Sequence, residues 1–319
     1  MRSLVAEALA RRADLLERLA AEDTDCWRLF NGTTEGAPGL TIDRYGAYGL
    51  IQTFREPLGP DDAAIIQDLI GLPAVWRHRG RDAEETAQPD WSTESQPFRE
   101  LGVAYSAPLV HRGRDPWLFL DLRAGRRWIQ QNAQGRSVLN TFAYTGGSGL
   151  VAALSGATEV CQLDHGGWCL EAGEALADLN GVQIESIRAD FFVALRQFAG
   201  LKLRGKAARR GFTQLPARSF GLIVLDPPTF TRGPFGAVDI VGDYASLAKP
   251  CLLSLEPGGI LLATNHSARV DQATFEEQVT RCAAKAGRPV SRVERLANDA
   301  DFPSYDDSPP LSVSAFHVD

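Results

Sequence analysis

The stretch that decides the fold of this chain is Ser137-Val138-Leu139-Asn140-Thr141-Phe142-Ala143-Tyr144-Thr145-Gly146-Gly147-Ser148-Gly149. A short apolar run leads into a polar turn with three glycines, and an alanine- and leucine-rich segment follows from Leu150 to Leu154. This order is typical of a strand, a tight loop and the start of a helix. Glycines in such a loop remove side chains where the backbone approaches a ligand or the next helix. The stretch therefore predicts a loop that binds a phosphate or a nucleoside.

The composition suits an ordinary protein with a full hydrophobic core. The chain has 319 residues, enough for two domains, and 44% of them are hydrophobic. Its formal net charge of −7 argues against bulk, non-specific binding to nucleic acid but leaves room for a local basic patch. No apolar run approaches the roughly 18 residues of a membrane span, and the N-terminus lacks a secretory apolar region. The five cysteines lack metal-binding spacing, so we expect a cytoplasmic protein without structural zinc.

From Val138 onward, the pattern is strand, loop and helix, repeated. Strands are predicted at 137–141, 159–163, 184–188, 220–225, 259–264 and 311–318. Strands that alternate with helices imply parallel βαβ units, so we expect an α/β fold with a Rossmann-like, doubly wound and mostly parallel sheet. The predicted domains are an N-terminal helix in residues 1–24, a small α+β domain over 25–117 that could recognise substrate, and the α/β domain over 118–319.

Acidic residues mark the ends of three predicted strands. Asp164, Asp190 and Asp226 lie there, and Asn140 ends the strand before the glycine loop. Ligands of open α/β sheets bind at the carboxyl ends of the strands, and an acidic residue about 20 places beyond a glycine loop can accept both ribose hydroxyls. Asp164 has that spacing, and Asp190 could accept an adenine amine. The alternative is that these residues cap helices. Three of them at consecutive strand ends favour an adenosine-containing ligand.

The loop lacks both common nucleotide signatures, because it contains neither Gly-x-Gly-x-x-Gly nor a Gly-Lys-Ser/Thr sequence. The remaining candidate that combines adenine, ribose and a cationic sulfonium is S-adenosyl-L-methionine. The stretch Asp226-Pro227-Pro228-Thr229-Phe230 fits this ligand, since two prolines stiffen a loop at a strand end. Phe230 could stack on a planar target base, a contact of about 1–3 kcal/mol, or could belong to the core.

These motifs resemble those of a known family, the class I methyltransferases of bacterial large-subunit ribosomal RNA of the I and K types. The resemblance is carried by five stretches and covers about residues 25 to 319. They are Leu139–Gly147, Asp226–Phe230, Glu256–Leu261, the Leu118–Arg126 stretch that is similar to an aromatic-Leu-Asp-Gln-Arg element, and Gly36–Gly46 with its Pro-Gly-Leu-x-Ile-Asp-Arg pattern.

The resemblance implies S-adenosylmethionine binding by 118–319 and a role for each matching position. The implied cofactor residues are Phe119, Asp121, Arg123, Asn140, Phe142, Tyr144, Gly146, Asp164, Asp190, Phe191 and Asp226. The first three would close over the cofactor, the next four would line its methionine and ribose, and Asp164 would bind the ribose hydroxyls. Asp190 and its neighbour Phe191 would bind adenine. The candidate residues of the methyl-transfer site are Asp226, Pro227, Pro228, Phe230, Asn265 and His266.

The chain also departs from the family pattern. Leu122 replaces the usual glutamine, His165-Gly166-Gly167-Trp168 is an unusual start for the next helix, and residues 1–25 are too short for the N-terminal PUA domain of the I type. His266 stands where the I type has a cysteine, and methylation of cytosine carbon-5 needs a cysteine nucleophile. We therefore expect methyl transfer to a base nitrogen. Asn265 or His266 could orient the base, and His266 could accept a proton from an amine or hydroxyl, or simply face solvent.

The expected partner is RNA, and the resemblance implies large-subunit ribosomal RNA. The segment from Lys202 to Arg210 has five basic and no acidic residues, which suits phosphate contacts or a solvated loop. Two alternatives stay open. One is a methyltransferase for a small molecule or a protein, and the other is an S-adenosylmethionine-binding protein without catalysis. The sequence leaves the target nucleotide, the methylated atom and the oligomeric state undecided.

Overall fold

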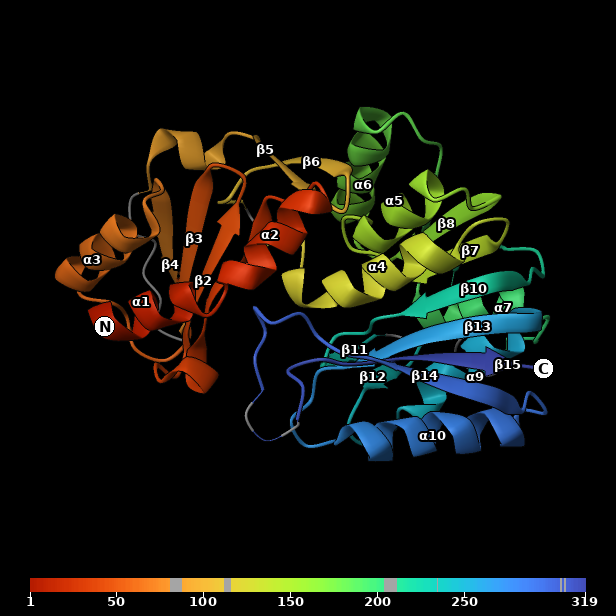
Figure 1. The fold of residues 1–319 in the computed structure, drawn as a ribbon. Helices are drawn as coiled ribbons and strands as arrows, with labels where there is room; N and C mark the ends of the chain where they lie inside the picture. The colour runs from red at the N-terminus through yellow and green to blue at the C-terminus, as the bar shows by residue number, and fades with distance from the viewer. Residues whose placement is uncertain (81–87, 112–115, 204–210, 234, 305, 307) are drawn as a thin grey trace. The chain divides into compact units, whose positions relative to one another are not determined.

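The structure, a computed structural model, describes residues 1–80, 88–111, 116–203, 211–233, 235–304, 306 and 308–319. The chain forms two compact units, which Figure 1 shows in the colours of the sequence. Unit 1 contains Met1–Arg123 and Asn298–Asp307, and unit 2 contains Ala124–Ala297 and Ser308–Asp319. This division differs from the predicted boundary at residue 118, because two segments expected in the α/β domain belong to unit 1. Within the described part of the chain, no helix is long and apolar enough to cross a membrane.

Unit 1 is built on a sheet of four described strands in the order β1-β2-β3-β4. They are β1 (Cys26–Asn31), β2 (Leu40–Tyr45), β3 (Tyr48–Thr53) and β4 (Ala74–His78). Helix α3 (Pro60–Ile70) connects β3 to β4, which pair in parallel, and the other pairs are antiparallel. The further elements are a hairpin and three 3-10 turns: β5 (Gln96–Glu100), β6 (Val103–Ala107), η1 (Gly32–Glu35), η2 (Asp90–Thr93) and η3 (Leu120–Leu122).

The N-terminal segment forms two helices where the apolar pattern predicted one. Helix α1 (Arg2–Ala10) and helix α2 (Ala13–Ala21) are separated by a turn that contains Arg12. The Arg12 guanidinium is buried, and it donates to both carboxylate oxygens of Glu35 at 2.8 Å. Burial of an unpaired guanidinium would be costly, so the turn places Arg12 against its acidic partner. The apolar stripe contains no sign of this turn, because arginine usually marks the solvent face of a helix.

A second buried guanidinium, that of Arg123, joins distant parts of unit 1. It donates to Asp299 at 3.1 Å, to Asp301 at 3.1 Å and to Glu100 at 3.3 Å. Burial acts to lower the pKa of Arg123, but Asp301 and Glu100 outweigh it and raise that pKa above its ordinary value. Because the two aspartates come from the segment 298–307, this ion-pair cluster holds that segment in unit 1.

Unit 2 contains the predicted α/β sheet, whose described strands lie in the order β14-β15-β13-β10-β7-β8-β9. Their bounds are β7 (Ser137–Thr141), β8 (Glu159–Asp164), β9 (Glu185–Arg188), β10 (Phe220–Leu225), β13 (Leu255–Asn265), β14 (Val290–Leu296) and β15 (Ser312–Val318). The strands β13, β10, β7, β8 and β9 pair in parallel, and β15 is antiparallel to both of its neighbours. The Rossmann-like fold class is confirmed. The edge strand β14 was not predicted.

Helices cover the sheet of unit 2 and connect its strands (Figure 1). They are α4 (Arg123–Asn132), α5 (Gly147–Leu154), α6 (Gly167–Leu179), α7 (Phe191–Phe198), α9 (Ala245–Leu253) and α10 (Gln272–Lys285). Helices α7, α9 and α10 pack on one face of the sheet in a single buried cluster that includes Leu195, Leu252 and Phe275. A short hairpin of β11 (Phe230–Arg232) and β12 (Ala237–Asp239) follows β10.

The Arg123 cluster should dominate the stability of unit 1. We expect Arg123→Met to lower the free energy of unfolding by about 3–5 kcal/mol, because the methionine leaves buried carboxylates without their cation. Urea unfolding followed by tryptophan fluorescence would measure the change. The control is Arg281→Met on the exposed surface of α10, where loss of the ion pair with Glu277 should cost under about 1 kcal/mol. Equal losses of unfolding free energy in the two variants would show that the Arg123 cluster does not dominate the stability of unit 1.

Candidate functional site

The candidate site lies where neighbouring parallel strands of unit 2 end together. Strand β7 is followed along the sheet by β8 and β9 on one side and by β10 on the other, so the order of strands reverses at β7. Ligands of doubly wound sheets bind at such a reversal, beyond the carboxyl ends of the strands. The register aligns Thr141 with Leu163 on β8 and with Leu225 on β10. The residues that follow, Phe142, Asp164 and Asp226, therefore begin three adjacent loops at one edge of the sheet.

The loop after β7 has an unusual backbone conformation. Phe142 and Tyr144 both have a φ of 51°, and Gly146, at the N-cap of α5, has a φ of 86°. Left-handed backbone is strained for residues with a side chain, at a cost on the order of 1–3 kcal/mol each. Contacts with α7 and β8 hold it: the Phe142 ring stacks on Phe191 at 4.6 Å, and the Tyr144 N–H donates to Asp164 at 3.0 Å. Such strain is concentrated at functional sites, which supports the location of the site.

The glycines of this loop make room for a side chain rather than for a ligand alone. A Cβ at Gly146 would lie 2.3 Å from the Oε1 atom of Gln162, and one at Gly149 would lie 2.9 Å from its Nε2 atom. Gln162 is 1% exposed, and its Nε2 atom donates to the Gly146 carbonyl at 3.4 Å. Gly173 of α6 faces the same amide. Gln162 therefore packs against the loop and supports it, a role that the sequence does not indicate because Gln162 lies within an apolar strand.

Asp164 is held with its carboxylate at the start of the loop after β8. Its Oδ1 atom accepts the Gly166 N–H at 2.8 Å, and its Oδ2 atom accepts the Tyr144 N–H at 3.0 Å. Each carboxylate oxygen can accept a further hydrogen bond, so the group is fixed in place and still able to bind two hydroxyls. His165 lies 3.5 Å from Oδ1. Trp168, at the start of α6, meets the Tyr144 ring edge-on at 5.6 Å.

Asp190 does cap a helix, as the alternative interpretation held. Its Oδ1 atom accepts the N–H groups of Phe192 at 2.9 Å and Val193 at 3.3 Å at the start of α7. Burial raises the pKa of Asp190 above its ordinary value, although these two N–H groups act to lower it. The Oδ2 atom makes neither of these bonds, so capping and ligand binding are compatible. Phe191 is buried between the rings of Phe142 and Phe192 and is part of the core.

The end of β13 fastens the loop that follows β10. The Thr264 hydroxyl donates to the Asp226 carboxylate, and His266 shares a hydrogen bond with the Thr229 hydroxyl. The Asn265 amide is buried, donates to the Ile240 carbonyl at 2.9 Å and accepts the Ser267 N–H at 2.9 Å. Asn265 is one of two residues, with His266, predicted to orient a base, and its side-chain amide instead bonds to backbone groups. Neither Thr264 nor Thr229 was singled out from the sequence, and their only signal is their position in the two motifs.

The remaining residues of the transfer site differ in exposure. Pro227 is buried beneath the loop, whereas Pro228 is exposed. Phe230 is 54% exposed at the start of β11, with the Arg232 guanidinium 5.4 Å from the centre of its ring. This exposure excludes the core interpretation of Phe230. The ring is therefore available to a planar ligand.

Four of the implied cofactor residues do not lie in the loops at the carboxyl ends of the strands. Asn140 is buried within β7. Phe119, Asp121 and Arg123 belong to unit 1, so their closure over a cofactor stays a prediction. Phe119 is exposed, whereas the Arg123 guanidinium is enclosed by carboxylates. Leu122, which replaces the family glutamine, is buried, so this departure from the pattern lies in the core. Most of the basic segment 202–210 lies outside the described residues, which end at 203 and resume at 211.

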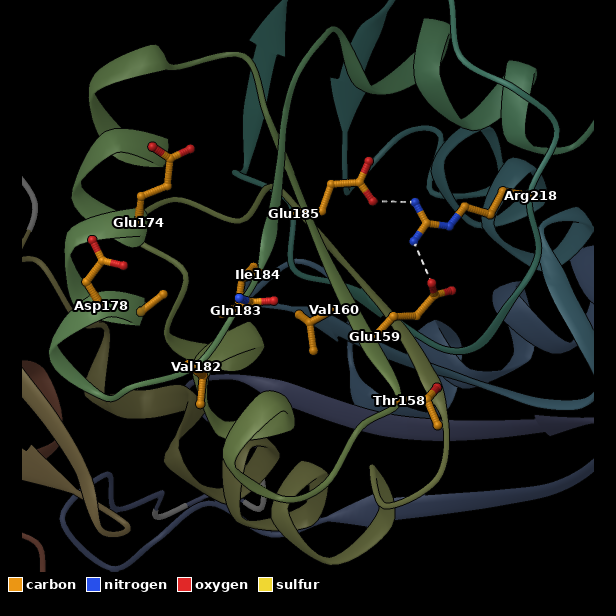
Figure 2. Close-up of a pocket in the computed structure, with 11 residues that line it drawn as sticks. Thr158, Glu159, Val160, Glu174, Asp178, Val182, Gln183, Ile184, Glu185 and Arg218 are labelled. Atoms are coloured by element: carbon orange, nitrogen blue, oxygen red, sulfur yellow. Dashed lines mark hydrogen bonds and ion pairs between the residues drawn. The ribbon is translucent and has the colours of Figure 1, made fainter.

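A groove of about 550 Å³ lies at the opposite edge of the sheet (Figure 2). Its lining includes residues at the starts of β8 and β9, with Glu174 and Asp178 of α6 on one wall. Arg218 bridges Glu159 at 3.1 Å and Glu185 at 2.5 Å, as the dashed lines in Figure 2 mark. None of the predicted site residues lines this groove. The groove is thus separate from the candidate site at the carboxyl ends.

Comparison with known proteins identifies related sequences. Residues 74–317 match the family described as S-adenosylmethionine-dependent methyltransferase. The chain is 32% identical over 316 residues to a ribosomal RNA large subunit methyltransferase of Deinococcus radiodurans, covering 93% of this chain and 73% of the relative. It is 28% identical over 317 residues to ribosomal RNA large subunit methyltransferase I of Vibrio cholerae, covering 94% and 75%. These matches confirm the resemblance inferred from the motifs.

The solved structures support the fold. One from Streptococcus mutans, described as an S-adenosylmethionine-dependent methyltransferase, aligns with a TM-score of 0.80 and 20% identity over 99% of this chain and 80% of that chain. At this identity, the likeness bears on the fold alone.

The fit of Gln162 beneath the loop can be tested by adding one methyl group. We expect Gly146→Ala to destabilise the protein by about 1–3 kcal/mol more than Gly181→Ala. Both glycines have positive φ, but a Cβ at Gly181 meets no atom within 4 Å. Thermal unfolding would compare the two variants. In a Gln162→Ala background the difference should shrink, and a difference that persists there would show that Gln162 is not its cause.

Proposed function

Because this chain belongs to the S-adenosylmethionine-dependent methyltransferase family, we propose that it transfers the methyl group of this cofactor to a base nitrogen of large-subunit ribosomal RNA. The family assignment makes S-adenosylmethionine the cofactor and methyl transfer the reaction. The acceptor and the residues that act on it are the proposed part. The single observation that carries the site is the Asp164 carboxylate, which two backbone N–H groups fix at the reversal point of the sheet.

The residues at this edge fit the cofactor. Asp164 would accept the two ribose hydroxyls, since backbone donors hold its oxygens in place and leave lone pairs unused. Asp190 would accept the adenine amine through its Oδ2 atom, while Oδ1 caps α7. Tyr144 and Gly146 would present the loop backbone to the methionine part. When bound, S-adenosylmethionine supplies a methyl group on a sulfonium that is already activated for transfer.

In this proposal, the chain itself contributes by placing the attacking nitrogen next to the methyl group of the cofactor. Asp226 and the two prolines after it form a stiff loop beside the Asp164 site, and Thr264 fixes the Asp226 carboxylate. A stiff loop can hold the attacking nitrogen in line with the methyl group, and such orientation accounts for much of the rate of a two-reactant step. Phe230 would stack on the target base, because its ring is exposed and lies close behind the prolines.

The cysteines support a nitrogen target over cytosine carbon-5. That reaction needs a thiolate that attacks the ring, and all five cysteines of the chain are buried. Cys169 follows Asp164 on the next helix, and burial raises its pKa to about 12, which keeps it a thiol. Burial likewise raises the pKa of Cys161 to about 12. A buried thiol of this kind is a core residue rather than a nucleophile.

Ribosomal RNA as the acceptor rests on the relatives. Both are named as large-subunit ribosomal RNA methyltransferases and align over more than nine-tenths of this chain. The exposed Phe230 with its neighbouring Arg232 agrees with a nucleic-acid acceptor, since aromatic and guanidinium groups both stack on bases. The net charge of −7 favours the alternative of a small-molecule or protein acceptor. A direct assay of the acceptor separates these possibilities.

Loss of the ribose-binding carboxylate should abolish most cofactor affinity. We expect Asp164→Ala to bind S-adenosylmethionine at least about 30-fold more weakly, because two hydrogen bonds to a charged group are lost. Isothermal titration calorimetry would measure the dissociation constant. The matched control is Asp178→Ala, which removes an exposed carboxylate of α6 at the opposite edge of the sheet and should bind as the unmodified protein does. Wild-type affinity in Asp164→Ala would refute this site.

Ribosomal RNA should be a direct acceptor of the methyl group. We expect purified protein with methyl-labelled S-adenosylmethionine to label large-subunit RNA from cells that lack the corresponding gene, and not RNA from cells that contain it. Scintillation counting of the purified RNA would measure the transfer, with Asp164→Ala as the inactive control. An RNA that takes up no label, while a protein or small-molecule extract does, would replace ribosomal RNA as the acceptor.

A further inference from the structure

We infer that the acceptor nitrogen carries a hydrogen, and that the Thr229 hydroxyl and the His266 imidazole form a pair that takes up its proton. The inference rests on the proposed function and specifies its substrate: an exocyclic amine or a ring N–H of a base, as opposed to a nitrogen with only a lone pair. It starts from the hydrogen bond between Thr229 Oγ1 and His266 Nε2, which joins the Asp226–Phe230 loop to the end of β13.

The Thr229–His266 hydrogen bond is exposed, whereas the neighbouring contacts between β13 and the loop region are made by buried residues. Three consecutive residues of β13 and its end contact the loop region, and the first two do so from buried positions: Thr264 to Asp226, and Asn265 to the Ile240 carbonyl. The third contact, from His266 to Thr229, lies at the open surface. The two buried contacts already fasten the loop. An exposed hydrogen bond adds little stability because water competes for both partners, so this contact contributes little to fastening the loop.

The backbone fixes the Thr229 hydroxyl next to the transfer site. The Thr229 carbonyl accepts the Ile240 N–H at 3.4 Å, and the Ile240 carbonyl accepts the Asn265 amide at 2.9 Å. Thr229 therefore has a defined position between the stiff Pro227-Pro228 pair and the exposed Phe230 ring. A base stacked on Phe230 would present its edge beside this hydroxyl. The pair therefore adjoins, in the chain, the Phe230 ring on which the proposed acceptor would stack.

An N–H acceptor must lose a proton in the reaction, and such a pair can take it up. When the nitrogen attacks, an N–C bond forms, the C–S bond breaks and its electron pair stays on sulfur, so the positive charge moves to the nitrogen. An amine or imino nitrogen must then lose one proton, whereas a nitrogen without hydrogen has none to lose. In the imidazole tautomer protonated at Nδ1, Nε2 accepts from the Thr229 hydroxyl. The hydroxyl oxygen can take the substrate proton while its own proton passes to Nε2, and the imidazolium releases it to solvent.

Paired variants separate this role from a structural one. The side chain introduced by His266→Gln can keep a hydrogen bond to Thr229 but accepts no proton, and Thr229→Ser keeps the hydroxyl that Thr229→Val removes. We expect His266→Gln and Thr229→Val to lower kcat roughly 100-fold with an unchanged KM for S-adenosylmethionine, and Thr229→Ser to stay within about threefold. Added imidazole should restore part of the kcat of His266→Gly and none of that of Thr229→Val.

The methylated nucleoside gives the independent readout. Digestion of labelled large-subunit RNA and mass spectrometry should identify a base methylated on an amine or a ring N–H. A product methylated at guanine N7, at cytosine carbon-5 or on the ribose would overturn the inference while leaving ribosomal RNA methylation standing. Unchanged kcat in His266→Gln would also overturn it. If the wild-type protein transfers no methyl group to ribosomal RNA, the proposed function fails, and the inference fails with it.

Discussion

The site depends on one constraint, the hydrogen-bonded register of parallel strands around β7. Because β7 pairs with β8 and β10 at matched residues, Thr141, Leu163 and Leu225 end level with one another. The residues after them enter one edge of the sheet together, although they run from position 142 to position 226 of the chain. The strained loop, the anchored Asp164 and the stiff loop at Asp226 all require this alignment. A slip of one residue in a parallel strand would reverse the direction of every side chain along it.

Much of this arrangement could be predicted from the sequence, because it follows from local pattern. Apolar runs of strand length that alternate with helices specify parallel βαβ units, and acids at strand ends mark the carboxyl edge. The same reasoning could not find β14, whose residues are largely exposed and mix charged with apolar side chains. It could not find the role of residues 298–307 either, since ion pairs between distant segments leave no periodic signal.

At the site, the residues could be predicted from the sequence, but the hydrogen-bond partners of their side chains could not. Asp164 and Asp226 lie where the strand ends predicted them. Asn265, however, uses its amide on the Ile240 carbonyl, a contact set by the path of the hairpin that begins at β11. The role of Gln162 could not be predicted for a related reason. Its amide packs beside the loop only because glycines of the loop and of α6 leave space for it. The role of a buried polar side chain depends on its hydrogen-bond partners, and the tertiary structure decides which groups those are.

The segment 298–307 has a consequence for how this protein could have arisen. The chain enters unit 2 after Arg123, returns to unit 1 at Asn298 and leaves it again at Ser308. A gene fragment that ends at residue 123 would encode Arg123 and Glu100 but neither Asp299 nor Asp301, the acids that neutralise the buried guanidinium. Unit 1 is therefore not a module that recombination could move as one contiguous exon-like piece. A transfer that keeps both segments of unit 1 must also carry the sequence of the α/β sheet that lies between them.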